Sequence, residues 1–401
     1  MHRDREGGIV SPAAVALDIP VAATLRTGAI ARARRARGEP VISLGLGEPE
    51  FATPPAVLEA TRRALAEGFT RYSSPVGLPE LRELIAGDLR CRGVLLAEPG
   101  NVVVTPGAKA AMFITLRVLL RPGDEVVLLE PCYVSYRPQV ALACPGAVVR
   151  GCDLRRDDFA PDWPALAECL GPRTRVVVTN FPNNPTGRML TPLELSRLAR
   201  LVAERAPGAF VIADEVYDRL DWGGVRLSPV GAAAPVADRT ITIGGLSKRC
   251  AMTGWRIGWL VAPAEVAAAA GLVQQHLNTC TCTFIQKGAC AAFAAGDDGL
   301  DAYRRELDER AWVLNETARA NDRLRLVPPQ GGLFAFLDVS GTGLAADDFA
   351  ARLLETSSVV VTPGNAFGRS WTDHIRVSLC APTAEFRTGV SLLDRFVRGL
   401  P

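Results

Sequence analysis

Short apolar runs rich in β-branched residues recur along the middle of the chain, with helical stretches between them. Such alternation is typical of a largely parallel sheet with helices on both faces. The prolines and glycines at 328–332 mark a later boundary, and the apolar residues 333–337 after it predict a strand of a smaller α+β unit. The apolar runs of the larger unit are 101–104, 125–129, 175–179, 210–213, 240–243 and 256–261.

We therefore expect an α/β protein with two domains. The large domain takes residues 48–290, and the smaller α+β domain combines 1–47 with 291–401. The helical stretch 301–321 is expected to connect the two. A chain of 401 residues with 48% hydrophobic residues is long enough to bury cores of this kind.

Charge and hydropathy patterns argue against several classes of protein. The formal net charge is +2 with both signs interspersed, and the arginines between 32 and 37 alternate with alanines, which indicates a solvated helix face rather than a nucleic-acid surface. No apolar stretch approaches the roughly 18 residues that span a bilayer, and the charged first residues lack a following apolar segment with a cleavage site. We expect a cytoplasmic protein without membrane or nucleic-acid partners.

Cysteine and histidine usage offers little to a metal site. The 10 cysteines show no paired CxxC spacing, and the closest arrangement, Cys280-Thr281-Cys282, has no second pair beside it. We expect reduced, mostly buried thiols and no metal. With 3 histidines in the chain, a histidine-rich metal centre or a serine–histidine triad has few residues to draw on.

Lysine is rare in this chain, and one lysine has an informative position. Of the 45 basic residues only Lys109, Lys248 and Lys287 are lysines. An isolated lysine is more often a solvated surface residue. Lys248, however, follows the apolar run 240–243, so we expect it at the carboxyl end of a strand, where open α/β sheets bind ligands. A desolvated lysine can lose its proton and form a Schiff base, which arginine cannot do.

Polar residues follow three other predicted strands. Asp214 ends the run 210–213 and is suited to hold a ligand cation, although a lone aspartate there is more often a helix cap. Asn184 lies in a turn of prolines and glycine after 175–179. The small residues 105–110 after the first run are typical of a strand-to-helix turn that binds an anion such as phosphate.

Five motifs occur in one order along the chain, and together they resemble the fold-type I enzymes that depend on pyridoxal 5′-phosphate (PLP), the class I aminotransferases of the aspartate/aromatic type. The resemblance covers roughly residues 20–395 and implies a large domain with a mostly parallel seven-stranded sheet between helices. The motifs are Gly47 to Phe51, Tyr72 with Gly77 to Arg82, Asn183 to Gly187, Asp214 to Tyr217, and Ser247 to Gly258.

The resemblance implies catalytic and cofactor-binding roles for several residues. Lys248 would bind the cofactor covalently and carry the proton between the substrate α-carbon and the cofactor C4′. Asp214 would pair with the pyridine nitrogen and keep it protonated. Asn184 and Tyr217 would hydrogen-bond the phenolic oxygen, and Tyr133 would stack on the ring in place of the tryptophan that many relatives have.

The resemblance also implies a phosphate site and a homodimer. Phosphate would be held by the backbone N–H groups of Ala108 and Lys109, by the Arg256 guanidinium and by the Ser247 hydroxyl. Tyr72 would reach the phosphate of a second subunit, so the two active sites would share residues.

For the substrate, the resemblance implies that Arg376 binds the α-carboxylate as a bidentate pair, with Asn184 beside it and Gly47 allowing close backbone approach. Thr24 and Lys109 match positions that bind the distal carboxylate in an aspartate-using branch. An acidic substrate is therefore favoured, while aromatic, basic or unusual amino acids stay open.

Three functions remain open at this point. The first is an aminotransferase that exchanges an amino group between an L-amino acid and a 2-oxo acid by a ping-pong mechanism. The second is a PLP-dependent oxidase or β/γ-lyase, because these reactions use the same cofactor-binding residues. A non-catalytic ligand sensor is disfavoured because the full catalytic set is present and no DNA-binding extension of useful length precedes residue 20.

Overall fold

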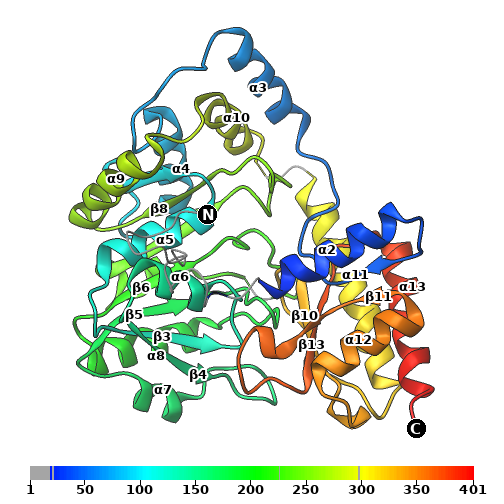
Figure 1. Cartoon of the computed structure of the whole chain (residues 1–401). Coiled ribbons are helices and arrows are strands. Elements are labelled where there is room, and N and C mark those ends of the chain that lie inside the picture. Colours follow the sequence, from blue (N-terminus) through cyan, green and yellow to red (C-terminus); the bar gives the residue numbers. More distant parts are fainter. Residues whose placement is uncertain (1–18, 20–21, 225, 297–298) are drawn as a thin grey trace, which may run out of the picture.

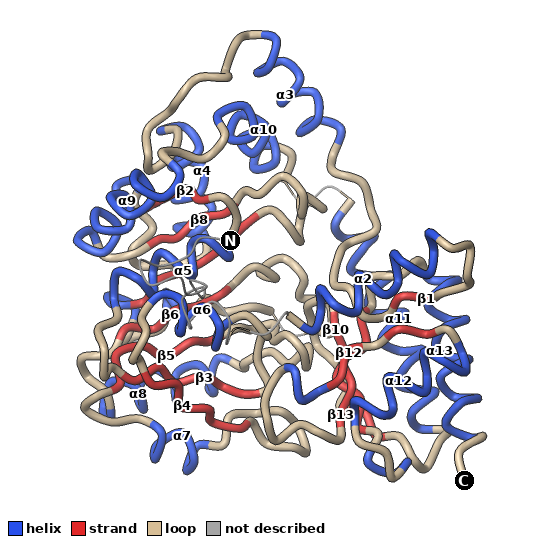
Figure 2. Tube along the Cα trace, viewed as in Figure 1, coloured by secondary structure: helices blue, strands red, loops and turns tan. Residues whose placement is uncertain are grey.

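The computed structural model describes residues 19, 22–224, 226–296 and 299–401. Within these residues the larger body is built on a seven-stranded sheet of order β2-β8-β7-β6-β5-β3-β4 (Figures 1 and 2). β8 is antiparallel to both neighbours, and the other strand pairs are parallel, which confirms the predicted fold class. The strands are β2 (Val102–Thr105), β3 (Glu125–Glu130), β4 (Val148–Asp153), β5 (Thr174–Thr179), β6 (Phe210–Asp214), β7 (Thr240–Gly245) and β8 (Gly258–Val261).

Helices cover both faces of this sheet (Figure 1). Side chains of α5, α6 and α9 pack on one face and those of α7 and α8 on the other, while α4 and α10 cover β2 and β8. Val126 of β3 contributes to the first cluster and Val127 to the second, as strand alternation requires. The helices are α3 (Pro55–Ala66), α4 (Pro79–Cys91), α5 (Ala108–Leu119), α6 (Tyr136–Ala143), α7 (Trp163–Cys169), α8 (Pro192–Arg205), α9 (Ala264–Asn278) and α10 (Thr283–Ala294).

A smaller body lies beside the first and holds the C-terminal part of the chain (Figure 1). Its antiparallel sheet has the order β12-β13-β10-β9 within the residues described. Its helices are α2 (Ala23–Ala36), α11 (Leu300–Arg319), α12 (Ala346–Ser357) and α13 (Thr383–Arg398), and its strands are β9 (Arg325–Leu326), β10 (Phe334–Asp338), β12 (Thr362–Pro363) and β13 (His374–Ser378). Short 3-10 helices are η1 (Pro99–Asn101), η2 (Val230–Ala232), η3 (Ala237–Arg239), η4 (Ser340–Thr342) and η5 (Gly364–Ala366).

The N-terminal segment packs with this smaller body. β1 (Ile42–Ser43) pairs in parallel with β11 (Val359–Val360), and the Arg34 guanidinium of α2 donates to the Leu354 carbonyl of α12 at 3.2 Å. The expected domain division requires the N-terminal segment to pack with the C-terminal part of the chain, as it does here. The bounds 48–290, 1–47 and 291–401 stay a prediction. Residues 1–18, 20 and 21 lie outside the described residues.

Two details of the large sheet differ from the sequence expectation. β4 was not predicted, because it lies at the sheet edge and five of its six residues are exposed or half-buried, so it lacks a continuous apolar run. The run 256–261 becomes a strand only from Gly258, because Arg256 has a φ of +55° and leaves the extended conformation.

Across the described ranges, no helix has the length and apolar character needed to cross a membrane.

Three neighbouring parallel strands bring the predicted polar residues together. β5, β6 and β7 are adjacent in the sheet and point the same way, so their carboxyl ends meet at one edge. Asn184 follows β5, Asp214 ends β6 and Lys248 follows β7. This edge is where parallel α/β sheets bind ligands.

Candidate active site

A cavity of about 290 Å³ lies at this edge and reaches the β13 strand of the smaller body. It is large enough for a small cofactor with part of a substrate. Every site residue predicted from the sequence lines it, apart from Tyr72. The predicted residues at the cavity are Thr24, Gly47, Ala108, Lys109, Tyr133, Asn184, Asp214, Tyr217, Ser247, Lys248, Arg256 and Arg376.

Lys248 is half-buried, and its amine lies against the backbone. Its Nζ donates a hydrogen bond to the Gly47 carbonyl at 2.7 Å. A side chain at 47 has no room, because a Cβ there would lie 2.2 Å from the Phe334 ring. Burial lowers the pKa of Lys248, which raises the fraction of neutral amine available as a nucleophile or base.

Asp214 is a desolvated carboxylate at the end of β6. Burial raises its pKa to about 6, while the hydroxyl of Tyr136 donates to its Oδ2 at 2.7 Å and opposes that shift. The Asn180 amide donates to the Asp214 carbonyl at 2.8 Å and fixes the backbone. A carboxylate so placed is stabilised by a cation that enters the cavity. Sequence reasoning missed Tyr136 and Asn180, although Tyr136 lies three residues beyond Tyr133 and Asn180 directly follows β5.

Arg376 is a buried guanidinium with incomplete pairing. Its Nη1 donates to the Asn184 Oδ1 at 3.0 Å and its Nη2 to the Gly45 carbonyl at 2.6 Å. Burial lowers the pKa of Arg376 to about 10, so it is still charged at neutral pH. Its Nε has no hydrogen-bond partner, and no carboxylate pairs with it in the part of the chain that the structure describes. An incoming carboxylate would supply the missing partner.

Asn184 links Arg376 to the other side of the cavity. Its Nδ2 donates to the Tyr217 hydroxyl at 3.4 Å, and its backbone N–H donates to the Asn180 side chain at 3.0 Å. Burial raises the pKa of Tyr217, so its hydroxyl stays protonated and can donate a hydrogen bond. Amide and phenol together are suited to hold an oxygen anion.

The N-terminus of α5 and Arg256 form a corner suited to an anion. Gly107 precedes the helix with a φ of +88°, and a Cβ on it would lie 2.3 Å from the Arg256 Nη2. Ala108 and Lys109 begin the helix, so their backbone N–H groups have no intrahelical partner. Ser247 adds a hydroxyl to the same cavity. Helix N–H groups, a guanidinium and a hydroxyl are the donors that phosphate prefers, so these residues fit a phosphorylated cofactor.

Tyr133 and Lys109 stand together on the wall of the cavity. The Lys109 Nζ lies 5.6 Å from the centre of the Tyr133 ring. Burial alone would raise the pKa of Tyr133, but the nearby Lys109 charge and a hydrogen bond with Ser135 outweigh it, and the pKa is lowered. The Lys109 amine therefore supplies positive charge to a cavity that Thr24 also lines.

Tyr72 lies outside the cavity of its own chain. It is 85% exposed and occupies the loop between α3 and α4. Its role at the phosphate of a second subunit stays a prediction.

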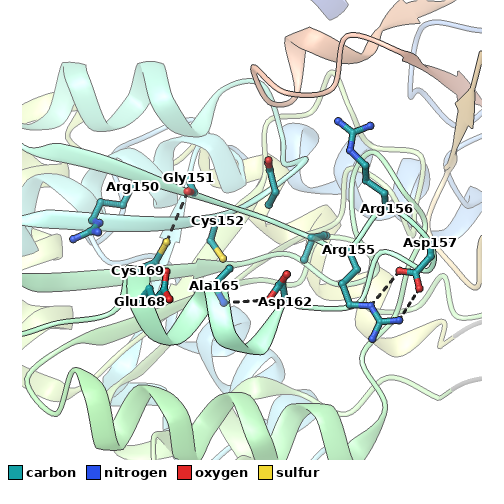
Figure 3. Close-up of a pocket in the computed structure, with 12 residues that line it drawn as sticks. Arg150, Gly151, Cys152, Arg155, Arg156, Asp157, Asp162, Ala165, Glu168 and Cys169 are labelled. Carbon is teal, nitrogen blue, oxygen red and sulfur yellow. Dashed lines mark hydrogen bonds and ion pairs between the residues drawn. The ribbon is translucent and has the colours of Figure 1, made fainter. Parts of the chain in front are cut away.

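A second hollow, of about 700 Å³, lies at the surface beside β4 and α7 (Figure 3). Two of its acidic groups already have partners: Arg155 donates to both oxygens of Asp157 at 3.1 and 2.8 Å, and Asp162 caps α7 by accepting from the Ala165 N–H at 3.1 Å. Burial raises the pKa of the Cys152 thiol and keeps it protonated. We assign no chemistry to this hollow.

The fold and the cavity match one family of enzymes. Residues 39–391 match the family described as "Aminotransferase class I and II", so the chain belongs to that family and is a PLP-dependent transaminase. The predicted aminotransferase class is thereby confirmed.

Relatives of similar identity carry different substrate names. An aspartate aminotransferase of Musicola paradisiaca is 38% identical over 351 residues, which cover 86% of each chain. An arginine–pyruvate transaminase of Pseudomonas aeruginosa is also 38% identical, over 87% of this chain and 88% of its own. The structure of Thermus thermophilus aspartate aminotransferase with maleate has a TM-score of 0.90, 34% identity, and coverage of 96% and 100%.

Replacement of Lys248 tests the position of the reactive amine. We expect Lys248→Ala to lose the visible absorbance that borohydride reduction fixes to the protein, because the amine past the carboxyl end of β7 is then absent and the other amine of the cavity, that of Lys109, lies beside the Tyr133 ring. Lys287→Ala is the matched control, since Lys287 pairs with Glu80 at the surface. The measurement is the absorbance of reduced, denatured protein after incubation with PLP. A label retained in Lys248→Ala and lost in Lys287→Ala would show that the wrong lysine was chosen.

Proposed function

We propose that this chain binds PLP in the 290 Å³ cavity and moves an amino group between an acidic L-amino acid and a 2-oxo acid by a ping-pong mechanism. The observation that carries the proposal is the convergence of Lys248, Asp214 and Arg376, from three different segments, on one cavity. A neutral amine, a desolvated carboxylate and a guanidinium without a carboxylate partner fit, in turn, an aldehyde, a pyridinium and an amino acid carboxylate. When bound, PLP supplies an aldehyde for amines and a ring that accepts electrons from the α-carbon.

In this proposal each residue acts at a stated atom. Arg376 binds the α-carboxylate and orients the α-carbon. Lys248 takes the α-proton on its Nζ and returns it, since its lowered pKa raises the fraction of neutral amine. Asp214 holds a proton on the pyridine nitrogen, and the Tyr136 hydroxyl at 2.7 Å favours the ionised form that this needs.

Other residues hold the cofactor in position. Asn184 and Tyr217 donate to the phenolic oxygen, while Tyr133 packs against the ring. Ala108, Lys109, Ser247 and Arg256 bind the phosphate at the N-terminus of α5, where the helix dipole favours negative charge.

Amino acids added singly distinguish transamination from the other reactions of such a site. We expect one amino acid, without oxo acid, to shift the absorbance of the bound cofactor to shorter wavelength in a single turnover, and a 2-oxo acid to restore it. The reason is that a ping-pong enzyme stores the amino group between its half-reactions. Hydrogen peroxide formed in air, or ammonia released without any oxo acid, would favour an oxidase or a lyase instead.

We propose an acidic substrate because of the charge on Lys109. Lys109 and Thr24 both line the cavity, and the Thermus structure was determined with maleate, a dicarboxylate. The arginine–pyruvate transaminase is as similar to this chain as the aspartate aminotransferase of Musicola is, at 38% identity. The substrate class therefore needs a test of its own.

Substitution of Lys109 measures that preference. We expect Lys109→Ala to lower kcat/KM for aspartate by about 10- to 100-fold, the loss of one charge-assisted hydrogen bond, and to change kcat/KM for phenylalanine much less. The measurement is the ratio of the two values in parent and variant. An equal loss for both amino acids would assign Lys109 to the cofactor alone.

We also propose a homodimer in which Tyr72 completes the phosphate site of the partner. Exposed apolar side chains on α6 and α9, Leu142, Leu272 and Leu277, offer a surface for a second copy. We also propose a cytoplasmic location for this dimer.

Mixed dimers test the sharing of sites. We expect co-expressed Lys248→Ala and Tyr72→Ala chains to recover about a quarter of the parental active sites, because half of the dimers are mixed and each has one intact site. The measurement is activity of the purified mixture against each variant alone. Activity no higher than the two single variants would contradict shared sites.

A further inference from the structure

Six charged side chains pair with one another near the turns that follow β6 and β7, and none of them lines the cavity or is predicted to touch the cofactor or substrate. Three are acids and three are arginines, so the group is neutral as a whole. We call this set the buried charge network: Asp88, Arg92, Glu215, Asp218, Arg219 and Arg249.

The contacts of the network run through helix α4. Arg92, which caps the C-terminus of α4, donates to the Asp218 carboxylate at 2.7 Å and to Glu215 at 3.2 Å. Asp88, inside α4, pairs with Arg249 at 3.5 Å and with Arg219. Arg249 also lies 3.7 Å from Asp218. One helix therefore holds two separate turns of the large sheet by charge.

Sequence position ties the network to the active site. Glu215 directly follows Asp214, Asp218 directly follows Tyr217, and Arg249 directly follows Lys248. Asp214, Tyr217 and Lys248 are thus each followed in the chain by a residue of the network.

Backbone and aromatic contacts fix these neighbours further. The Glu215 N–H donates to the Ile243 carbonyl of β7 at 2.9 Å, and the other Glu215 oxygen accepts from the Val230 N–H at 3.0 Å. The Arg249 guanidinium lies 4.7 Å from the centre of the Phe293 ring and 5.6 Å from that of Trp259. A guanidinium can lay its planar face on a ring while its edge pairs with two carboxylates, whereas an ammonium has no planar face.

Stability alone is a poor reason for such a network. Charges with side-chain exposures of 4 and 7%, as for Glu215 and Arg249, lose hydration that their pairing only partly offsets, and apolar residues of similar volume often stabilise as well. Burial raises the pKa of Glu215 and Arg92 opposes it, while Asp214 also acts on the same carboxyl. The network and the catalytic carboxylate therefore influence each other across the β6 turn.

We propose that the buried charge network positions the turns of Asp214, Tyr217 and Lys248, with Arg249 as the residue that fixes the Lys248 turn against α4. Its members are positioning residues, since they act through the residues beside them. The inference rests on the proposed roles of Lys248 and Asp214 toward PLP.

Arg249→Met tests the proposal in the PLP-bound protein. Three acids would then face two arginines, and the Lys248 turn would lose its link to Asp88 and Phe293. We expect the pH midpoint of the cofactor absorbance, which reports the proton at the Lys248 nitrogen, to move by about half a pH unit or more. We expect kcat to fall about tenfold or more, with KM changed less than about threefold. The thermal midpoint should fall as well.

A double variant separates position from charge. Arg249→Met with Asp88→Asn leaves two acids and two arginines, so it should recover thermal stability, while the absorbance midpoint stays displaced because the Lys248 turn is still unanchored. Arg249→Lys keeps the charge but loses the planar contacts, so the pH midpoint of its cofactor absorbance should be displaced too. This variant takes the place of Arg249→Met if Arg249→Met does not fold. A midpoint that matches the parent in the single variants, or returns to it in the double variant, would overturn the proposal.

The matched control lies at the opposite edge of the sheet. Glu125, the first residue of β3, is 5% exposed and pairs with Arg150 at 3.3 Å and Arg173 at 2.7 Å. Arg150→Met removes one of two partners of a buried acid, as Arg249→Met does, but far from the cavity. It should lower thermal stability without moving the absorbance midpoint. A missing cofactor band in the parent would contradict the proposed function, whereas parental midpoints in the Arg249 variants contradict only this inference.

Discussion

Burial of the Lys248 amine beside a guanidinium is the constraint on which the rest of the site depends. Removal from water lowers the pKa of Lys248 and the Arg376 charge lowers it further, against the opposing effects of Cys380, Tyr133 and Glu48. The amine then needs an acceptor, which the Gly47 carbonyl supplies at 2.7 Å. The Phe334 ring of β10 leaves no room for a side chain at position 47. Packing in the smaller body therefore requires glycine at the position whose carbonyl accepts the hydrogen bond from the Lys248 amine.

The parts of this site that sequence reasoning could find are those set by buried parallel strands. β5, β6 and β7 are buried on both faces, so they read as continuous apolar runs, and the polar residue that ends each run must lie at one edge. That rule places Asp214 without any relative, because Asp214 ends its strand, and it places Asn184 and Lys248 only within the turns that follow β5 and β7. The roles toward a cofactor came from the resemblance, because no spacing rule says which atom of a ligand a carboxylate faces.

The parts that sequence reasoning missed depend on contacts between distant segments. Tyr136 meets Asp214 across 78 positions and Arg92 meets Asp218 across 126, and neither pair leaves a periodic signal. The edge strand β4 was missed for the opposite reason, since a local pattern exists but is mostly polar. Substrate class is harder still, because the α-carboxylate and cofactor contacts are common to every reaction that such a cavity supports.

The cavity and the buried charge network contain two kinds of cation: arginines that keep their charge and a lysine that can lose its proton. Arg376 is charged at neutral pH even with its pKa lowered to about 10, and Arg92 and Arg249 use planar heads to hold two partners at once. In the proposed mechanism a permanent charge at Lys248 would fail, since a proton has to leave its amine and return to it. Rarity alone does not mark it, however. Lys287 is also one of the three lysines of the chain. Its amine pairs with Glu80 and lies 4.4 Å from the centre of the Phe69 ring, and an arginine could make both contacts equally well. What distinguishes Lys248 is its position past the carboxyl end of β7, where the Gly47 carbonyl accepts its hydrogen bond and the next residue, Arg249, belongs to the buried charge network.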